Sequence, residues 1–335
     1  MTVNIGVVGT GMIGTVHINN LTSGVSGSSV TAVMDTDAAR AADIARRVGA
    51  TAVGSSADLA RRDDVDAVLI ATPGYTHAEI VLDLLSVGKP VLCEKPLATR
   101  ADDAVRILEA EAAMGKRLIQ VGFMRRFDPG YLEVKAAIDD GSIGEPLMVH
   151  MFHRNPEVPD FFGDEMVMND AFIHEMDVTR WLLGDEVVAV RVLQGKSTPA
   201  AGADLHDPQI LVLETRSGVL VVAEAFVANG FGYDVRCEVL GSTGTIELAT
   251  PRLSRRTSQG SVSEIIHPSW RERFGETYRL ELQEWVRSIE AGRPAGPSSW
   301  DGYAATVIAD ACVAAVSTPG DRVPVGLTER PALYA

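Results

Sequence analysis

The chain has 335 residues, about twice the length of a common domain of about 150 residues, so its length predicts two domains. Its 46% hydrophobic and 22% charged residues are ordinary for a globular protein and exclude a disordered or fibrous chain. Its 30 basic and 45 acidic side chains give a net charge of −15, which argues against nucleic-acid and anionic-membrane partners.

The first 122 residues alternate short apolar runs, rich in β-branched residues, with helical patterns. Nearly continuous hydrophobic strands separated by helices with 3.6-residue apolar spacing predict βαβ units around a parallel sheet. The expected strands are Val3–Val8, Val30–Met34, Val65–Ala71, Pro90–Cys93 and Arg117–Val121. The expected helices are about residues 12–22, Asp37–Val48, Thr76–Val87 and Thr99–Met114.

The rest of the chain reads as strands joined by turns, which predicts an α+β arrangement with a mostly antiparallel sheet. Ser217-Gly218 is a candidate hairpin turn, and Gly195–Asp207 reads as a loop. The expected strands are Leu147–Phe152, Val187–Leu193, Ile210–Thr215, Val219–Val227, Val235–Leu240 and Thr245–Leu248. The expected helices are Pro129–Asp139, Ala171–Leu183, Tyr278–Ala291 and Trp300–Val316.

A glycine-rich turn, Gly9-Thr10-Gly11-Met12-Ile13-Gly14, directly follows the first strand and opens a helical pattern. The first glycine permits a tight turn, the second lets backbone approach a pyrophosphate, and the third lets helix and strand pack closely. A glycine-rich structural turn is the alternative. In its context, the turn predicts a dinucleotide-binding Rossmann domain at residues 1–122. A substrate-binding and oligomerisation α+β domain with a large open sheet would follow at residues 123–335. Its last helix, about residues 300–316, could pack back on the first domain.

Asp35 ends the second expected strand, 21 residues after Gly14. A carboxylate at this place accepts hydrogen bonds from the adenosine ribose hydroxyls and repels a 2′-phosphate. Arg40 lies five residues further on, and no arginine directly follows Asp35. Asp35 therefore predicts NAD rather than NADP as the cofactor. The alternative is a surface aspartate that begins the next helix.

Glu94-Lys95-Pro96 directly follows the Pro90–Cys93 strand, at the carboxyl end of the expected sheet, where open α/β sheets place ligands. The Lys95 ammonium could bind a substrate hydroxyl. Pro96 would set the chain direction, and a cis peptide bond is one way to do so. The competing interpretation is a strand-end loop with a solvated lysine.

Asp170, His174 and Asp177 are spaced so that one helix face would carry all three. A carboxylate beside an imidazole orients the ring and raises its basicity, and such a histidine can remove a proton from an alcohol near neutral pH. The spacing alone is also compatible with a charged surface helix and a capping aspartate.

Together, the glycine turn and Glu94-Lys95-Pro96 resemble the Gfo/Idh/MocA family of sugar and cyclitol oxidoreductases, and the resemblance spans nearly the whole chain. It implies that Lys95, Asp170 and His174 are catalytic, with His174 as the general base, and that Asp177 is a supporting carboxylate at the substrate. It also implies a cofactor site. The residues of that site would be Gly9, Gly11, Met12, Ile13, Gly14, Asp35, Thr72, Pro73, His77, Glu94 and Lys95. His77 could equally be a helix residue without a ligand.

Three further segments are similar to the branch of this family that acts on inositols: Met124-Arg125-Arg126-Phe127-Asp128, His153-Arg154-Asn155 and Tyr233-Asp234. The stereochemistry of a polyol is read by several hydrogen-bonding groups around its ring. The resemblance therefore implies that Arg125, His153, Asn155 and Tyr233 bind substrate. Gly74-Tyr75-Thr76 departs from the Trp-Gly-Pro of the bacterial myo-inositol enzymes, which leaves the choice of polyol open.

The implied activity is NAD-dependent oxidation of a cyclitol secondary alcohol to a ketone, with myo-inositol to 2-keto-myo-inositol as the expected reaction. A dehydrogenase for scyllo-inositol or a pyranose sugar is the nearest alternative. A non-catalytic, NAD-linked sugar sensor is the alternative from another class. The family likeness also implies a homotetramer.

Cys93, Cys237 and Cys312 lie far apart and show no zinc-ligand spacing. We therefore expect neither a disulfide scaffold nor a metal site, and a reducing, cytoplasmic setting. No apolar stretch is long enough to predict a membrane span.

Overall fold

The computed structural model describes residues 2–249 and 254–334, and the chain forms two compact units. The first unit contains the described parts of residues 1–127, 277–306 and 328–335, and the second contains those of residues 128–276 and 307–327. The predicted division into a cofactor-binding domain, residues 1–122, and a substrate-binding and oligomerisation domain, residues 123–335, stays a prediction.

Helices and strands alternate in the first unit, as expected for βαβ units. The elements are β1 (Val3–Val8), α1 (Met12–Ser23), β2 (Ser28–Met34), α2 (Ala38–Val48), β3 (Thr51–Val53), α3 (Ser56–Ala60), β4 (Ala67–Ile70), η1 (Gly74–Thr76), α4 (His77–Ser86), β5 (Val91–Glu94), α5 (Ala101–Ala113), β6 (Ile119–Gly122), η2 (Met124–Phe127) and η4 (Ala332–Tyr334). Within the described residues, six strands pair in parallel in the order β3-β2-β1-β4-β5-β6. The predicted parallel sheet is confirmed.

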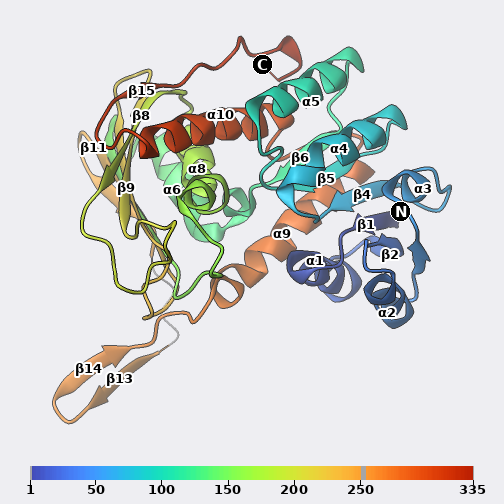
Figure 1. The fold of residues 1–335 in the computed structure, drawn as a ribbon, viewed down its shortest axis with the longest axis horizontal. Helices are drawn as coiled ribbons and strands as arrows, with labels where there is room; N and C mark the ends of the chain where they lie inside the picture. Colours follow the sequence, from blue (N-terminus) through green and yellow to red (C-terminus); the bar gives the residue numbers. More distant parts are fainter. Residues whose placement is uncertain (1, 250–253, 335) are drawn as a thin grey trace. The chain divides into compact units, whose positions relative to one another are not determined.

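The core of this unit lies on both faces of the sheet. Ile5 and Val7 of β1 pack with Ile18 and Leu21 of α1, and Trp285 belongs to the same buried cluster. Figure 1 shows α4 and α5 on the other side of the strands. The strands are buried on both faces, which explains why their sequences are almost continuously apolar.

The second unit is built on a mixed sheet. Its elements are α6 (Pro129–Asp139), β7 (Pro146–Arg154), α7 (Asp164–Met166), η3 (Val167–Ala171), α8 (Ile173–Leu183), β8 (Val187–Gln194), β9 (Gln209–Thr215), β10 (Leu220–Phe226), β11 (Asp234–Gly241), β12 (Thr245–Glu247), β13 (Arg255–Ser258), β14 (Ser261–Glu264) and β15 (Val323–Pro324). In the described part, seven strands follow the order β12-β11-β7-β10-β9-β8-β15, and only β7 with β10 is a parallel pair. The predicted mostly antiparallel sheet is confirmed.

Side chains alternate between the two faces of this sheet. On β10, Val221, Ala223 and Ala225 are buried, whereas Val222 and Phe226 are only partly buried. Figure 1 shows α6 and α8 against one face of the sheet. Gly218 adopts a φ of +94° in the turn between β9 and β10, which confirms the predicted hairpin at Ser217-Gly218.

Two long helices complete the described fold, α9 (Trp270–Glu290) and α10 (Ser299–Val316). Helix α10 matches its prediction, whereas α9 begins well before the predicted Tyr278. Near its start, the hydroxyl of Ser269 accepts from the backbone N–H of Arg271 and donates to Glu272. These local bonds begin the helix in a polar stretch that has little apolar periodicity.

Candidate active site

The glycine turn of the first unit has the shape that a pyrophosphate requires. Gly9 has a φ of +92°, and a Cβ on it would meet the carbonyl oxygen of Ala71 at 2.5 Å. A Cβ on Gly14 would lie 2.0 Å from the carbonyl oxygen of Gly9. A Cβ on Gly11, in contrast, would meet nothing within 4 Å among the described residues. Gly11 precedes the first residue of α1, so open space lies directly over a helix N-terminus that attracts anions.

Met12 and Ile13 occupy the first two positions of α1. The Met12 side chain is 63% exposed, whereas Ile13 packs against the apolar core between α1 and the sheet. Their backbone N–H groups belong to the first turn of the helix, whose N–H groups have no partner within the helix. The residues of this turn therefore fit a nucleotide pyrophosphate.

Asp35 follows β2 and links the glycine turn to the next helix. Its Oδ2 accepts from the backbone N–H of Thr10 at 2.7 Å and from the Thr10 hydroxyl at 2.8 Å. Its Oδ1 accepts from Nη2 of Arg40 at 2.6 Å and from the backbone N–H of Asp37 at 2.9 Å. Partial burial opposes ionisation of Asp35, but the Arg40 guanidinium and the N–H groups outweigh it and lower the pKa far below its ordinary value. Asp35 is therefore an ionised acceptor beside the glycine turn.

His77 is the first residue of α4 and is fully buried. Its Nδ1 lies 2.7 Å from the carbonyl oxygen of Pro96, and its Nε2 lies 2.9 Å from that of Thr72. Burial lowers the pKa of this imidazole, and the two carbonyl partners oppose that shift without reversing it. Because a carbonyl oxygen lies close to each ring nitrogen, His77 links the Thr72-Pro73 loop to the turn that follows β5.

The Glu94-Lys95-Pro96 turn lies at the carboxyl end of β5, and its Lys95–Pro96 peptide bond is cis. Oε1 of Glu94 lies 2.6 Å from Nε2 of His17 on α1, and both side chains are buried. Oε2 of Glu94 accepts from the backbone N–H of Lys95 at 3.1 Å. Glu94 thus fixes the backbone from which the Lys95 side chain extends.

Arg125 lies on the short helix η2, which follows β6 at the same edge of the sheet. Its side chain is 1% exposed. The neighbouring Arg126 forms an ion pair with Asp301 at 3.0 Å. The first unit therefore gathers the glycine turn, Asp35, Thr72, Lys95 and Arg125 on segments that follow the carboxyl ends of its strands.

In the second unit, Asp170 and His174 do not share one continuous α-helix, as their spacing had suggested. Asp170 lies in a π-helical turn, Val167–Ala171, and α8 begins only at Ile173. The N–H of Phe172 donates to the carbonyl of Val167 at 2.8 Å, five residues earlier. The wider turn changes the direction in which residues before α8 project, and such turns occur frequently at functional sites.

Helix α8 buries an unusual set of ionisable side chains. His174, Glu175 and Asp177 are each less than 10% exposed. Arg180 is also buried, and its Nε donates to Oε2 of Glu186 at 2.6 Å. Buried ionisable groups are costly unless they are paired, so their concentration on one helix indicates a functional segment.

His153, near the end of β7, contacts this helix directly. Its Nδ1 lies 3.0 Å from Oε2 of Glu175. The ring of Tyr233 lies edge-on to the His153 ring, with 6.3 Å between the centroids. Asn155 is half-buried, and within the described part of the chain its buried Oδ1 has no hydrogen-bond partner. The structure thus brings His153 and Tyr233 together in the second unit.

Sequence reasoning missed two residues of these networks, His17 and Glu175. His17 lies on the buried face of α1 with Gly14, Ile18 and Leu21, and that spacing of a titratable residue on an apolar face was the available signal. Glu175 directly follows His174, and no spacing rule connects it with His153 on a distant strand.

Comparison with known proteins decides the family. The family model for an oxidoreductase family, NAD-binding Rossmann fold, matches residues 3–123, and the model for the C-terminal alpha/beta domain of the same family matches residues 135–325. The chain belongs to the Gfo/Idh/MocA oxidoreductase family. It therefore carries the NAD-binding Rossmann domain of that family, as its glycine turn predicts, and the predicted family and fold class are confirmed.

Relatives of this Gfo/Idh/MocA chain match over its full length. It is 50% identical to inositol 2-dehydrogenase 3 of Saccharopolyspora erythraea over 334 residues, 100% of this chain and 98% of that protein. It is 48% identical to inositol 2-dehydrogenase 1 of the same organism, which it covers to 99%. A crystal structure of myo-inositol dehydrogenase from Lactobacillus casei in complex with NAD(H) and myo-inositol is 35% identical, with a TM-score of 0.97 and 100% of both chains covered.

Among residues 2–249 and 254–334, no three His, Cys, Asp or Glu side chains are grouped so that they could bind a metal ion. No helix in these described residues has the length and hydropathy of a membrane span.

Proposed function

We propose that this protein is an NAD-dependent inositol 2-dehydrogenase that oxidises myo-inositol to 2-keto-myo-inositol. One observation carries the proposal: a chain that is 35% identical over its full length, with a TM-score of 0.97, was solved with NAD(H) and myo-inositol. The relatives at 48–50% identity that are named inositol 2-dehydrogenase support the same substrate.

The first unit would bind the cofactor. The space over Gly11 would receive the pyrophosphate at the N-terminus of α1, and the Asp35 carboxylate would accept from the ribose hydroxyls. Thr72 and Pro73 would line the nicotinamide side of the site, and the buried His77 would contribute to it by holding their loop in place. When bound, NAD supplies the acceptor for the carbinol hydride.

His174 would act as the general base and remove the hydroxyl proton as the C–H hydride leaves the same carbon. Lys95 would bind the reacting oxygen and stabilise its developing negative charge. Asp170 would bind the same hydroxyl or orient the imidazole, and Asp177 would support the substrate side of the site. A secondary alcohol thereby becomes a ketone, with one proton and one hydride removed.

Arg125, His153, Asn155 and Tyr233 would bind the other hydroxyls of the ring. Inositol stereoisomers differ only in the orientation of these hydroxyls, so a site made of paired donors and acceptors distinguishes them. The contact between Glu175 and Nδ1 of His153 would set the direction of one such group.

Initial rates of NADH formation test this proposal. We expect the highest kcat/KM with NAD and myo-inositol in a panel that contains scyllo-inositol, common pyranoses and NADP. A preference for scyllo-inositol or a pyranose would favour the nearest alternative. Binding of a polyol without NADH formation would instead favour a non-catalytic sensor.

We further propose a homotetramer in the cytoplasm. The outer face of the second unit's sheet leaves Phe152, Val222 and Phe226 only partly buried, and Ile210 is 38% exposed. Exposed apolar sheet faces associate, so this face would pack against another subunit. Light scattering coupled to gel filtration would give the mass: a tetramer is expected, and a monomer would contradict the proposal. Cys93, Cys237 and Cys312 are buried and form no disulfide within the described residues, which fits a reducing compartment.

A further inference from the structure

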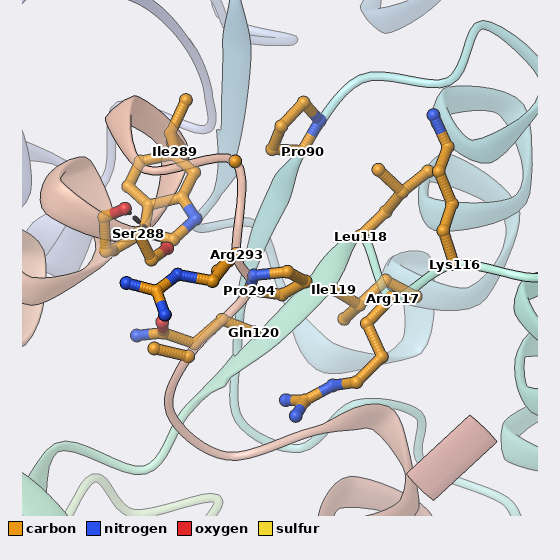
Figure 2. Close-up of a pocket in the computed structure, with 13 residues that line it drawn as sticks. Pro90, Lys116, Arg117, Leu118, Ile119, Gln120, Ser288, Ile289, Arg293 and Pro294 are labelled. Atoms are coloured by element: carbon orange, nitrogen blue, oxygen red, sulfur yellow. Dashed lines mark hydrogen bonds between the residues drawn. The ribbon is translucent and has the colours of Figure 1, made fainter. Parts of the chain in front are cut away.

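A cavity of about 240 Å³ opens in the first unit, away from the residues described above (Figure 2). Pro90 and Leu118, just before β5 and β6, line it together with Trp285 of α9 and Pro294. The cavity therefore lies at the amino ends of these strands. The residues of this unit that are proposed to bind substrate and cofactor follow the carboxyl ends, so this cavity is separate from them.

The buried part of the cavity is suited to a small apolar group. Leu118, Ile119 and Trp285 line it and are each at most 9% exposed. An engineered cavity of about 150 Å³ in another protein is large enough for benzene. The present cavity thus has room for a ring together with a polar substituent.

Gln120 points to a ligand with polar groups. Its side chain lines the cavity and is only 3% exposed. Within the described residues, neither Nε2 nor Oε1 of its amide has a hydrogen-bond partner. Gly296 packs against this side chain, since a Cβ on Gly296 would lie 2.8 Å from the amide. Burying an amide without partners is costly, and a bound polar group would remove that cost.

Three cationic side chains are among the residues that line the cavity: Lys116, Arg117 and Arg293. In the part of the chain that the structure describes, none of them is paired with a carboxylate. Nη2 of Arg117 donates to the carbonyl oxygen of Gly296 at 3.1 Å, and its buried Nε has no partner there. Figure 2 shows that Lys116 and Arg117 extend in opposite directions from adjacent positions. In a chain of net charge −15, this local excess of cations favours an anionic ligand.

We infer that this cavity binds a small carboxylate with an apolar body. The ring or branched chain would lie on Leu118 and Trp285, and the carboxylate would face Arg117 and Arg293. The planar guanidinium groups match a carboxylate with two parallel hydrogen bonds. The Gln120 amide would donate to the same carboxylate.

Fluorine NMR of fluorobenzoate with the full-length protein tests this inference. We expect line broadening that persists at saturating NAD and is much weaker for the neutral fluorobenzyl alcohol. Arg117→Gln and Arg293→Gln should each weaken fluorobenzoate binding about tenfold, because each removes a charge-assisted pair. The matched control, Arg216→Gln, changes an exposed arginine of the second unit and should have no effect.

Gln120→Leu should also weaken binding. If this variant does not fold, the two arginine variants, which change partly or fully exposed side chains, still decide the question. Absence of broadening with the wild type would overturn the inference. So would equal binding by the arginine variants and the control, or displacement of fluorobenzoate by NAD.

Discussion

Nε2 of His17 and Oε1 of Glu94 lie 2.6 Å apart, and this buried contact joins helix α1 to the end of strand β5. The helix starts at the glycine turn, and the strand leads directly into Lys95. One side-chain pair thus links the proposed pyrophosphate site to the turn that carries a proposed catalytic residue.

Removal of this contact should cost stability. His17→Ala would leave the Glu94 carboxylate buried without its partner, so we expect the free energy of unfolding to fall by about 3 kcal/mol. Urea denaturation measures this difference. The control His206→Ala, which changes a half-buried histidine whose bond to a loop carbonyl is exposed, should stay within about 0.5 kcal/mol of the wild type. Equal stability of both variants would mean that the His17 contact is not important for folding.

Cofactor preference should depend on Asp35 and Arg40 together. Asp35→Ser removes the ribose acceptor and releases Arg40, whose Nη2 lies 2.6 Å from Oδ1 of Asp35. We expect the affinity for NAD to fall about tenfold and the affinity for NADP to rise, as measured by fluorescence titration. Adding Arg40→Ala should cancel the gain for NADP. A variant with Asp35→Ser that kept its preference for NAD would refute the ribose assignment.

His77 should make stability depend on pH. Burial lowers the pKa of His77 in the folded chain, whereas an unfolded chain binds this proton with an ordinary pKa of about 6.5. The unfolded state therefore binds more protons on acidification, and the free energy of unfolding falls as the pH drops below about 6.5. Denaturation curves between about pH 7 and about pH 5.5 should show a steeper loss for the wild type than for His77→Gln. If the free energy of unfolding fell equally steeply with pH in both proteins, His77 would not be the cause of this pH dependence.

Glu175 should affect substrate binding through His153. Glu175→Gln replaces a charge-assisted hydrogen bond to Nδ1 with a neutral one, so we expect KM for the polyol to rise about tenfold while the NAD affinity stays unchanged. Glu214→Gln, which loses an exposed pair with Arg322, is the matched control and should leave KM unchanged. A fall in kcat without a change in KM would place His153 outside the binding role.

Most of the fold follows from local pattern. Strand β1 matches the predicted Val3–Val8, and α6 matches Pro129–Asp139. The three-residue strand β3 and the short helix α3 were not predicted because neither is long enough to show a period. The exposed hairpin β13–β14 was also missed, since its polar residues show no strand alternation.

The site was predictable only where residues of a suitable chemical type stand at the spacing that a known motif requires. The glycine turn and Asp35 form such a pattern, and the structure adds that Thr10 and Arg40 already bind the Asp35 carboxylate. The π-helical turn at Asp170 has no sequence rule, because its five-residue hydrogen bond depends on packing. The pairs His17–Glu94 and His153–Glu175 join distant parts of the chain and become visible only in the fold.

A double-mutant cycle on Lys95 and His174 tests the central claim most directly, that these residues act on one reacting hydroxyl. The measurement is kcat for NADH formation from myo-inositol in the wild type, Lys95→Ala, His174→Ala and the double variant. If the two act together, each single change should lower kcat by about 100-fold to 10,000-fold, and the double variant should be about as slow as the slower single variant. Losses that multiply in the double variant would mean that the residues act independently, and near-normal kcat in either single variant would contradict its proposed role.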